Sequence, residues 1–234
     1  MARGFQDGLD WMRHGTKVLL NVIELGEFDY AADTPLPGWT RKHVAAHVAA
    51  NAEALGNLLR WAATGERTPM YASPEERAAG IEAGTRLPDT ELTAWLCSSA
   101  ERLDAAMADL EPADWAAKVV TAQGRTVAAT EIPWMRAREV WVHAVDLSSG
   151  LALGVTFADL PAGYLAALCD DAVAKRSAGS GPALLLVATD VDRSWELPGD
   201  GSATRISGPL AEVAAYLTGR PCGFSHAPAL GPWL

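Results

Sequence analysis

Hydrophobic side chains recur every three to four positions through most of the first 150 residues. Residues at that spacing lie on one face of an α-helix, so the pattern predicts helices over 5–25, 41–63, 89–110 and 130–148. Segments rich in Pro and Gly (33–39 and 64–86) predict loops, and an extended stretch is expected near 118–127. Four long helices joined by loops predict a helix bundle for residues 1–150.

The pattern changes after Gly150. One more helix is expected over 161–176, followed by three short runs of β-favouring residues at 182–190, 193–199 and 203–208. A closing helix is expected over 209–219, with Pro209 in its first turn and Gly219 at its end. Residues 151–234 are therefore predicted to form a smaller α+β domain, and the fold class of the whole chain is predicted to be α+β.

Composition and charge limit the kinds of partner. The chain has 234 residues, of which 49% are hydrophobic and 21% charged, as in an ordinary folded protein. A net charge of −10 argues against a nucleic acid or an anionic membrane surface as partner. The charge says little about a small-molecule substrate, because a pocket can be locally basic on an acidic protein. The chain is expected to be a monomer.

Segments for export and membrane insertion are not expected. No window approaches 18 uninterrupted apolar residues, and the first residues lack the apolar run of a signal peptide. The three cysteines are far apart and odd in number, which fits a reducing compartment better than a disulfide framework. The sequence predicts a cytoplasmic protein.

The segment "REVWVHAVDL" (138–147) places Glu139 and His143 four residues apart in an otherwise apolar helix. Such residues share a helix face and lie about 40° apart. Metal sites in bundles use side chains from facing helices, so both are candidate ligands. The spacing alone leaves a second interpretation open, in which Glu139 faces water and His143 is a core histidine.

The helix at 41–63 offers His43 and His47 as a third ligand. His47 lies about 20° from Leu58 and about 60° from Val44 on a helical wheel, so it points into the apolar arc and is the better candidate. Two imidazoles and one carboxylate suit zinc and leave a fourth position open for water or substrate. A buried histidine bonded to a backbone carbonyl remains the alternative at this point.

Two arginines and the cysteines complete the candidate chemistry. Arg220 follows the closing helix and is either a two-point clamp for a carboxylate or a solvated surface arginine. Arg136 lies one turn before Glu139 and is expected to be its ion-pair partner. The cysteines have no histidine or basic cluster beside them in sequence, so no cysteine nucleophile is predicted.

Three segments together resemble one protein family. "LPGWTRKHVAAHVAANAEAL" (36–55), "RAREVWVHAVDL" (136–147) and "GPLAEVAAYLTGRP" (208–221) are similar to the mycothiol-dependent maleylpyruvate isomerases, a group within the DinB-like metal-binding four-helix bundles. The resemblance covers nearly the whole chain. It implies that His47, Glu139 and His143 are zinc ligands and that Arg220 is an active-site arginine supplied by the second domain.

The resemblance also implies a reaction. The family isomerises maleylpyruvate to fumarylpyruvate in gentisate breakdown, with mycothiol as thiol cofactor. A thiolate adds to the C=C bond, the resulting single bond rotates, and the thiolate leaves. Zinc would favour the thiolate at neutral pH, and Arg220 would pair with a substrate carboxylate.

Two other functions stay open on the sequence. A mycothiol S-transferase of the same fold would conjugate another electrophile and keep the thioether in its product. A non-catalytic metal-binding protein would keep the bundle and the metal without turnover. The sequence favours the isomerase, and product analysis distinguishes all three.

Overall fold

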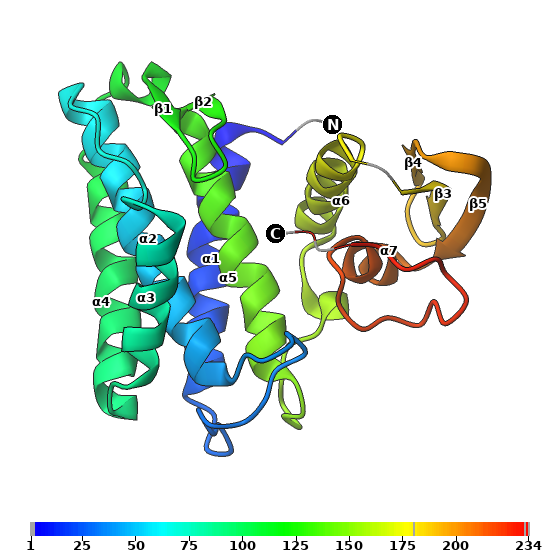
Figure 1. Cartoon of the computed structure of the whole chain (residues 1–234), viewed down its shortest axis with the longest axis horizontal. Helices are drawn as coiled ribbons and strands as arrows, with labels where there is room; N and C mark the ends of the chain where they lie inside the picture. The colour runs from blue at the N-terminus through cyan, green and yellow to red at the C-terminus, as the bar shows by residue number, and fades with distance from the viewer. Residues whose placement is uncertain (1–2, 180, 232, 234) are drawn as a thin grey trace. The chain divides into compact units, whose positions relative to one another are not determined.

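The computed structural model describes residues 3–179, 181–231 and 233, and the chain divides into two compact units (Figure 1). One unit spans Arg3–Gly154 and the other begins at Val155. The first is mainly helical and the second combines helices with a sheet, which confirms the predicted α+β class. In the described residues, no helix has the length and apolar character needed to cross a membrane.

The first unit is built on long helices, as the periodicity predicts. Its described helices are α1 (Phe5–Ile23), α2 (Arg41–Thr64), α3 (Pro74–Thr85), α4 (Asp89–Ala108) and α5 (Ile132–Ser148). Helix α1 packs along α5, and α4 packs along α2, with α2 and α5 also in contact (Figure 1). Helices α2 and α5 therefore form the centre of the bundle.

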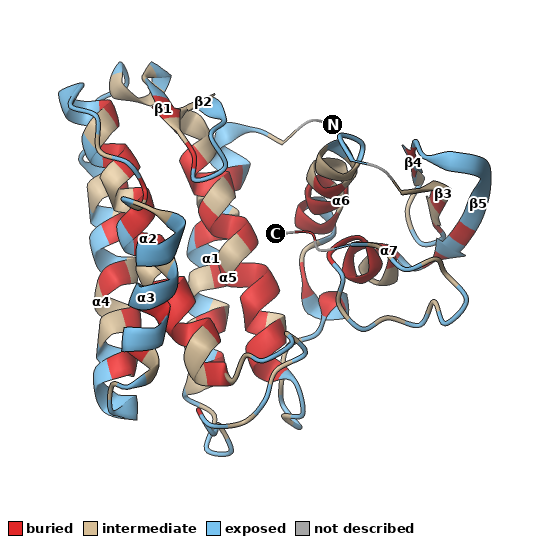
Figure 2. Ribbon diagram, in the orientation of Figure 1, coloured by how far each residue is buried: buried red, intermediate tan, exposed pale blue. Residues whose placement is uncertain are grey.

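The bundle core is made of large apolar side chains at these contacts. Less than 2% of each of the following side chains is exposed: Leu19 of α1, Leu55 and Leu58 of α2, Leu92 of α4, and Trp141 of α5. Burying a side chain of this size stabilises the fold by about 1.5–3 kcal/mol. Figure 2 shows α2 and α5 as the most completely buried helices of this unit.

Helices α1 and α5 approach closely at Gly15. A Cβ atom at Gly15 would lie 2.7 Å from Val140 Cγ2 and 2.8 Å from the Trp141 ring. Such distances are too short for carbon atoms in contact, so a side chain at this position would push the helices apart. Gly15 thus permits the packing that holds the indole of Trp141 against α1, where Trp141 Nε1 donates to the Trp11 carbonyl over 2.9 Å.

Helix α3 corrects the sequence analysis, which predicted a loop over 64–86. The helix lacks an apolar stripe, because only Ile81 and Gly84 are buried, so hydrophobic periodicity does not reveal it. Its beginning does carry a signal: Ser73 Oγ accepts from the Glu76 amide over 3.1 Å, and Pro74 occupies the first turn. Local capping specifies this helix more than burial does.

A hairpin precedes α5. Strands β1 (Lys118–Val120) and β2 (Thr126–Ala128) pair antiparallel, which confirms the extended stretch expected near 118–127. Gly124, in the turn between them, has a φ of 77°, a conformation that favours glycine.

The second unit packs helices on one face of a small sheet. Its described elements are α6 (Ala162–Arg176), β3 (Pro182–Ala188), β4 (Arg193–Leu197), β5 (Asp200–Gly208) and α7 (Leu210–Leu217). The strand order is β4-β3-β5, with β4 antiparallel and β5 parallel to β3. Leu186, Trp195 and Ile206 lie side by side in the register and are buried, and the three β-favouring runs are confirmed as strands.

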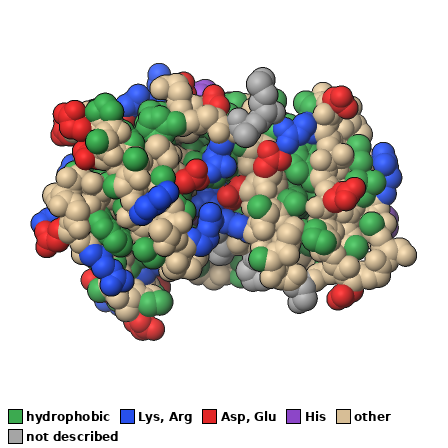
Figure 3. Space-filling view, turned by 90° about the horizontal axis from the view of Figure 1, so that it is seen from above, with side chains coloured by type: hydrophobic (Ala, Val, Ile, Leu, Met, Phe, Trp, Pro, Cys, Tyr) green, Lys and Arg blue, Asp and Glu red, His purple; other side chains and the backbone are tan. Residues whose placement is uncertain are grey.

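The surface has no single sign of charge on the face that Figure 3 shows. Acidic and basic side chains alternate there with apolar ones.

Candidate metal centre

Three side chains from two facing helices converge in the first unit. His47 comes from α2, and Glu139 and His143 come from α5. Their ligand atoms all lie within 4.8 Å of one another. Glu139 Oε2 is 2.9 Å from His47 Nε2 and 3.3 Å from His143 Nε2. The two imidazoles and the carboxylate therefore face one point between α2 and α5.

The helices place these polar groups inside the bundle because their other neighbours are apolar. Only 6% of His47 and 8% of His143 is exposed, and Glu139 is half-buried. The spacing of one turn on α5 puts Glu139 and His143 on one face of the helix, as predicted, and this face meets α2. Val44 and Val48, on either side of His47, are fully buried.

Asp146 orients His143. Its carboxylate is fully buried and accepts a hydrogen bond from His143 Nδ1 over 2.8 Å. A proton held on Nδ1 leaves the Nε2 lone pair available as a ligand, and this is how carboxylates commonly support metal-binding histidines. The sequence analysis did not single out Asp146, although its position three residues after His143 was a usable signal.

The electrostatics of the cluster favour the ionised form of the Glu139 carboxyl group. Burial opposes its ionisation, but the hydrogen bonds from His143 and His47 prevail and hold the pKa of Glu139 well below its usual value. Burial lowers the pKa of His47, so this imidazole is neutral. Burial also disfavours the charged form of His143, but the bonds to Asp146 and Glu139 outweigh it and raise the pKa of His143. In the metal-free cluster an ionised Glu139 thus faces a neutral His47 and a His143 whose protonation is favoured by two carboxylates.

This donor set fits a divalent cation. A metal ion binds histidines without the proton on the coordinating nitrogen, and it would take the place of the direct contacts between each Nε2 and Glu139. Two nitrogen ligands and one carboxylate oxygen are a set that zinc accepts, with a fourth position left open. The three donors are close enough together to bind one ion, and the buried Asp146 orients one of them. The residues present therefore fit a divalent cation.

A cavity lies beside the cluster of His47, Glu139 and His143. This cavity has a volume of about 220 Å³ and is lined by Leu36, Pro37, Trp39, His47 and His143. The first three residues belong to the segment that precedes α2, and the Trp39 ring meets the His47 ring edge to face at 5.6 Å. The cavity gives small molecules access to the imidazoles through an apolar entrance.

Arg77 of α3 adds a positive charge at the edge of the cluster. Its Nη2 lies 3.3 Å from His47 Nδ1, to which it donates, and its guanidinium lies over the Tyr71 ring at 5.9 Å. Sequence analysis missed both residues because it assigned 64–86 to a loop. An arginine at this place is a candidate to bind an anionic substrate.

Two other predictions have clear outcomes. His43 caps its own helix, since its Nδ1 lies 2.8 Å from Thr40 Oγ1 and accepts from the Thr40 amide, and it does not belong to the cluster.

The predicted ion pair between Arg136 and Glu139 is wrong. Arg136 Nη1 instead donates to the Val48 carbonyl over 2.7 Å and to Asn51 Oδ1 over 3.0 Å, because Arg136 extends across the core to α2.

Arg220 lies in the second unit, just after α7. Its amide donates to the Ala215 carbonyl over 2.9 Å, and its Nη1 donates to the Thr218 carbonyl over 2.7 Å. These bonds hold both the backbone and the guanidinium of Arg220 at the end of α7. A role for Arg220 in an active site stays a prediction.

Comparison with known proteins gives the family. Residues 13–148 match the family model described as the mycothiol maleylpyruvate isomerase N-terminal domain. The chain is similar to the crystal structure of the mycothiol-dependent maleylpyruvate isomerase, with a TM-score of 0.91 and 36% identity over 99% of this chain and 98% of that one. A histidine-to-alanine mutant of that enzyme matches with a TM-score of 0.90, again with 36% identity over 99% of this chain and 98% of that one.

The search of curated proteins found no match. The family model covers more than half of the chain, and the similar crystal structures cover nearly all of it. The chain belongs to the mycothiol maleylpyruvate isomerase family.

Proposed function

We propose that this protein is a maleylpyruvate isomerase that depends on mycothiol and on a zinc ion. The observation that carries the proposal is the convergence of His47, Glu139 and His143 with Asp146 behind them. The full-length similarity to the mycothiol-dependent enzyme supports the same reaction. Cytoplasmic location, a monomeric state and a place in the breakdown of gentisate belong to this proposal.

The reaction needs a nucleophile that adds reversibly. The cis C=C bond of maleylpyruvate does not rotate at ambient temperature, whereas the single bond formed by addition does, and elimination then restores a trans double bond. Mycothiol supplies the thiol for addition and elimination. A bound zinc ion would supply a positive charge that lowers the thiol pKa, so that the nucleophilic thiolate exists at neutral pH.

The protein residues hold the ion and orient its ligands. His47 and His143 would bind it through Nε2, Glu139 through a carboxylate oxygen, and Asp146 would keep the His143 ring in position. The cysteines do not supply the nucleophile. Cys169 in particular is fully buried, and burial keeps its thiol protonated by raising its pKa above the usual range.

Arg77 would bind one substrate carboxylate. A metal on His47 Nε2 requires the histidine proton to lie on Nδ1, so Nδ1 can no longer accept from Arg77. The guanidinium then loses its partner on His47 at the edge of the cluster. Maleylpyruvate carries a carboxylate at each end, and in this proposal Arg77 pairs with one and Arg220 with the other.

The test is to incubate zinc-loaded protein with maleylpyruvate, with and without mycothiol, and to follow the product by absorbance and mass. The expected result is fumarylpyruvate of unchanged mass that forms only when mycothiol is present. A product heavier by one mycothiol would identify an S-transferase instead. Zinc-loaded protein that gives neither product would contradict both enzymes and favour a metal-binding protein without activity.

A further inference from the structure

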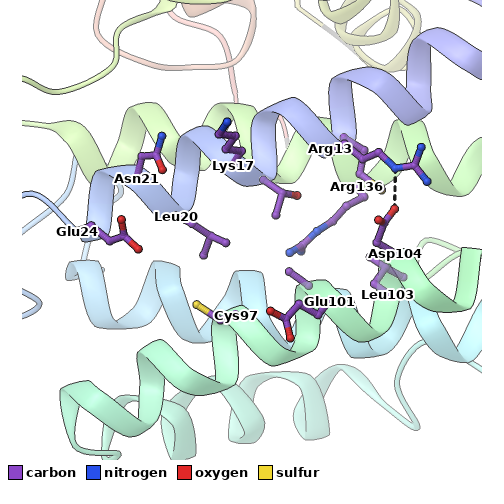
Figure 4. A pocket seen from close by; sticks show the side chains of 13 residues that line it. Arg13, Lys17, Leu20, Asn21, Glu24, Cys97, Glu101, Leu103, Asp104 and Arg136 are labelled. Carbon is purple, nitrogen blue, oxygen red and sulfur yellow. Dashed lines mark hydrogen bonds and ion pairs between the residues drawn. The ribbon is translucent and has the colours of Figure 1, made fainter.

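A second cavity lies in the first unit between α1 and α4 (Figure 4). Its volume is about 480 Å³, which is within the range of small-molecule sites. It shares no lining residue with the cavity beside His47 and His143, so the metal centre does not account for it. Helices α1 and α4 pack mainly on α5 and α2, which leaves space between them.

The wall of this cavity is largely apolar. Met12 and Leu20 line it from α1, and Cys97, Ala100 and Leu103 line it from α4. Leu20, Cys97 and Ala100 are only half-buried although they lie along the long helices of a bundle. Apolar side chains left partly exposed to a concave space are suited to contact the body of an apolar ligand.

The inner end of the cavity carries a buried positive charge. Arg136 comes from α5, is only 1% exposed, and reaches into the space between α1 and α4 (Figure 4). Both of its hydrogen bonds use Nη1, and Nε is buried without a partner. Burial lowers the pKa of Arg136 to about 10, so the side chain remains charged at neutral pH.

A buried guanidinium normally pairs with a carboxylate. Among the described residues, no carboxylate oxygen forms an ion pair with Arg136, whose two bonds go to a carbonyl and an amide oxygen. Glu139 on the next turn stabilises its charge only at longer range. The cavity therefore presents a cation that lacks its usual counter-ion.

The rim of the cavity restricts the ligand to a single negative charge. Asp104 is neutralised by Arg13 over 2.8 Å, but Glu24 and Glu101 form no ion pair among the described residues. Their carboxylates would repel a second anionic group at the mouth, and Lys17 offsets only one of them. A dicarboxylate such as maleylpyruvate suits this cavity poorly, in contrast to the metal centre with Arg77.

We propose that the cavity between α1 and α4 binds an apolar monocarboxylate, with the carboxylate on Arg136 and the apolar body against Met12, Leu20 and Leu103. The ligand would supply the missing counter-ion and cover the partly exposed apolar wall. Arg136 also links α5 to α2 at Val48, the residue after His47. An occupied cavity therefore contacts the same arginine that holds the two ligand-bearing helices together.

The experiment titrates the full-length protein with octanoate by calorimetry, with octanamide as a neutral compound of matched shape. The expected result is saturable binding of one octanoate and affinity for octanamide at least tenfold lower. Neither mycothiol nor maleylpyruvate is present, so the outcome is independent of the isomerase proposal. Absence of octanoate binding to folded protein, or equal affinity for octanamide, would overturn the proposal.

Two variants and a control variant locate the binding. Arg136→Met should weaken octanoate binding at least tenfold, while Arg205→Met, which removes an exposed arginine of the second unit, should leave it unchanged. Ala100→Trp keeps Arg136 in the chain but places a large side chain in the cavity, and it should abolish binding even if Arg136→Met does not fold. Folded Ala100→Trp protein that binds octanoate normally would place the ligand elsewhere and refute the assignment.

Chemical protection gives a second readout. Cys97 lines the cavity, whereas Cys222 is equally half-buried but belongs to the second unit. Saturating octanoate should slow modification of Cys97 by N-ethylmaleimide several-fold and leave the rate at Cys222 unchanged, as measured by peptide mass spectrometry. Equal rates at Cys97 with and without octanoate would contradict binding at this cavity.

Discussion

Asp146 shows how a single buried carboxylate sets the chemistry of a neighbouring residue. It accepts from His143 Nδ1 and so determines which nitrogen of that ring faces Glu139. The charge of Asp146 also raises the pKa of His143 against the effect of burial. A residue that touches no metal thereby decides whether His143 can act as a ligand.

Replacing Asp146 by Asn should weaken zinc binding about 10- to 100-fold, because the His143 ring loses its fixed tautomer and part of its basicity. The measurement is a competition titration against a chromogenic zinc chelator. Glu91→Gln, on the exposed surface of α4, is the matched control and should keep wild-type affinity. Equal affinities of the Asp146 variant and the wild type would show that Asp146 is only structural.

The lowered pKa of Glu139 predicts an acid-side loss of stability in the metal-free protein. An unfolded chain protonates this carboxyl near its ordinary value of 4.5, whereas the folded protein does so only at lower pH. Below that value the unfolded state binds more protons, so the contribution of Glu139, fully present at neutral pH, is lost as pH falls. Urea unfolding should show a free-energy difference between wild type and Glu139→Gln that shrinks as pH falls below 4.5. A free-energy difference that stays constant across this pH range would show that the pKa of Glu139 is not lowered in the folded protein.

Arg77 is predicted to bind substrate and to leave the metal in place. Arg77→Met should lower kcat/KM for maleylpyruvate by about 10- to 100-fold, in keeping with the loss of a charge-assisted contact of about 1.5–3 kcal/mol. Zinc content, measured by elemental analysis, should not change. Arg86→Met removes an exposed arginine from the end of the same helix and should retain full activity. If both variants are equally active, Arg77 has no part in substrate binding.

At the scale of elements, sequence patterns succeed where burial is periodic. The long helices α1, α2, α4 and α5 were predictable because apolar residues recur at helical spacing in each, and the strands because β-favouring residues run together between turn residues. Helix α3 was missed because it packs little of its surface, and Arg77 was missed with it. The capping residue Ser73 and Pro74 in the first turn of α3 are visible in the sequence, but two residues predict a helix less strongly than an apolar stripe does.

The close contact of α1 with α5 predicts opposite effects for two glycine substitutions. Gly15→Ala should destabilise the fold by about 1–3 kcal/mol, since its Cβ would lie 2.7 Å from Val140 Cγ2. Gly56→Ala in α2 should be neutral or stabilising by up to about 1 kcal/mol, because a Cβ there meets nothing within 4 Å. Urea unfolding measures both. Similar effects of the two changes would show that helix packing at Gly15 is looser than described.

At the scale of the whole molecule, the candidate site depends on more than local pattern. Spacing identified Glu139, His143 and His47 as possible ligands but could not distinguish them from core residues, and the family resemblance selected them. Arg220 belongs to the other unit. Helical periodicity carries no information on how residues of separate units act together, so its role rests on resemblance alone.

Arg220→Met should reduce the isomerisation rate at least tenfold while zinc content and folding of both units stay unchanged. Circular dichroism and elemental analysis check the fold and the metal, and Arg205→Met in the same unit serves as the control. Full activity of the Arg220 variant would remove this residue from the active site. It would leave the metal centre, which lies wholly in the first unit, unaffected.

The sparse packing of α3 has a kinetic consequence. A helix that buries only Ile81 and Gly84 belongs to the elements that open locally at little free-energy cost, whereas α2 and α5 open only when the bundle unfolds. Opening of α3 would carry Arg77 away from His47 without moving the three ligands. An anion held by Arg77 would then be released each time α3 opens, whereas an ion on the three ligands would be retained until the bundle unfolds.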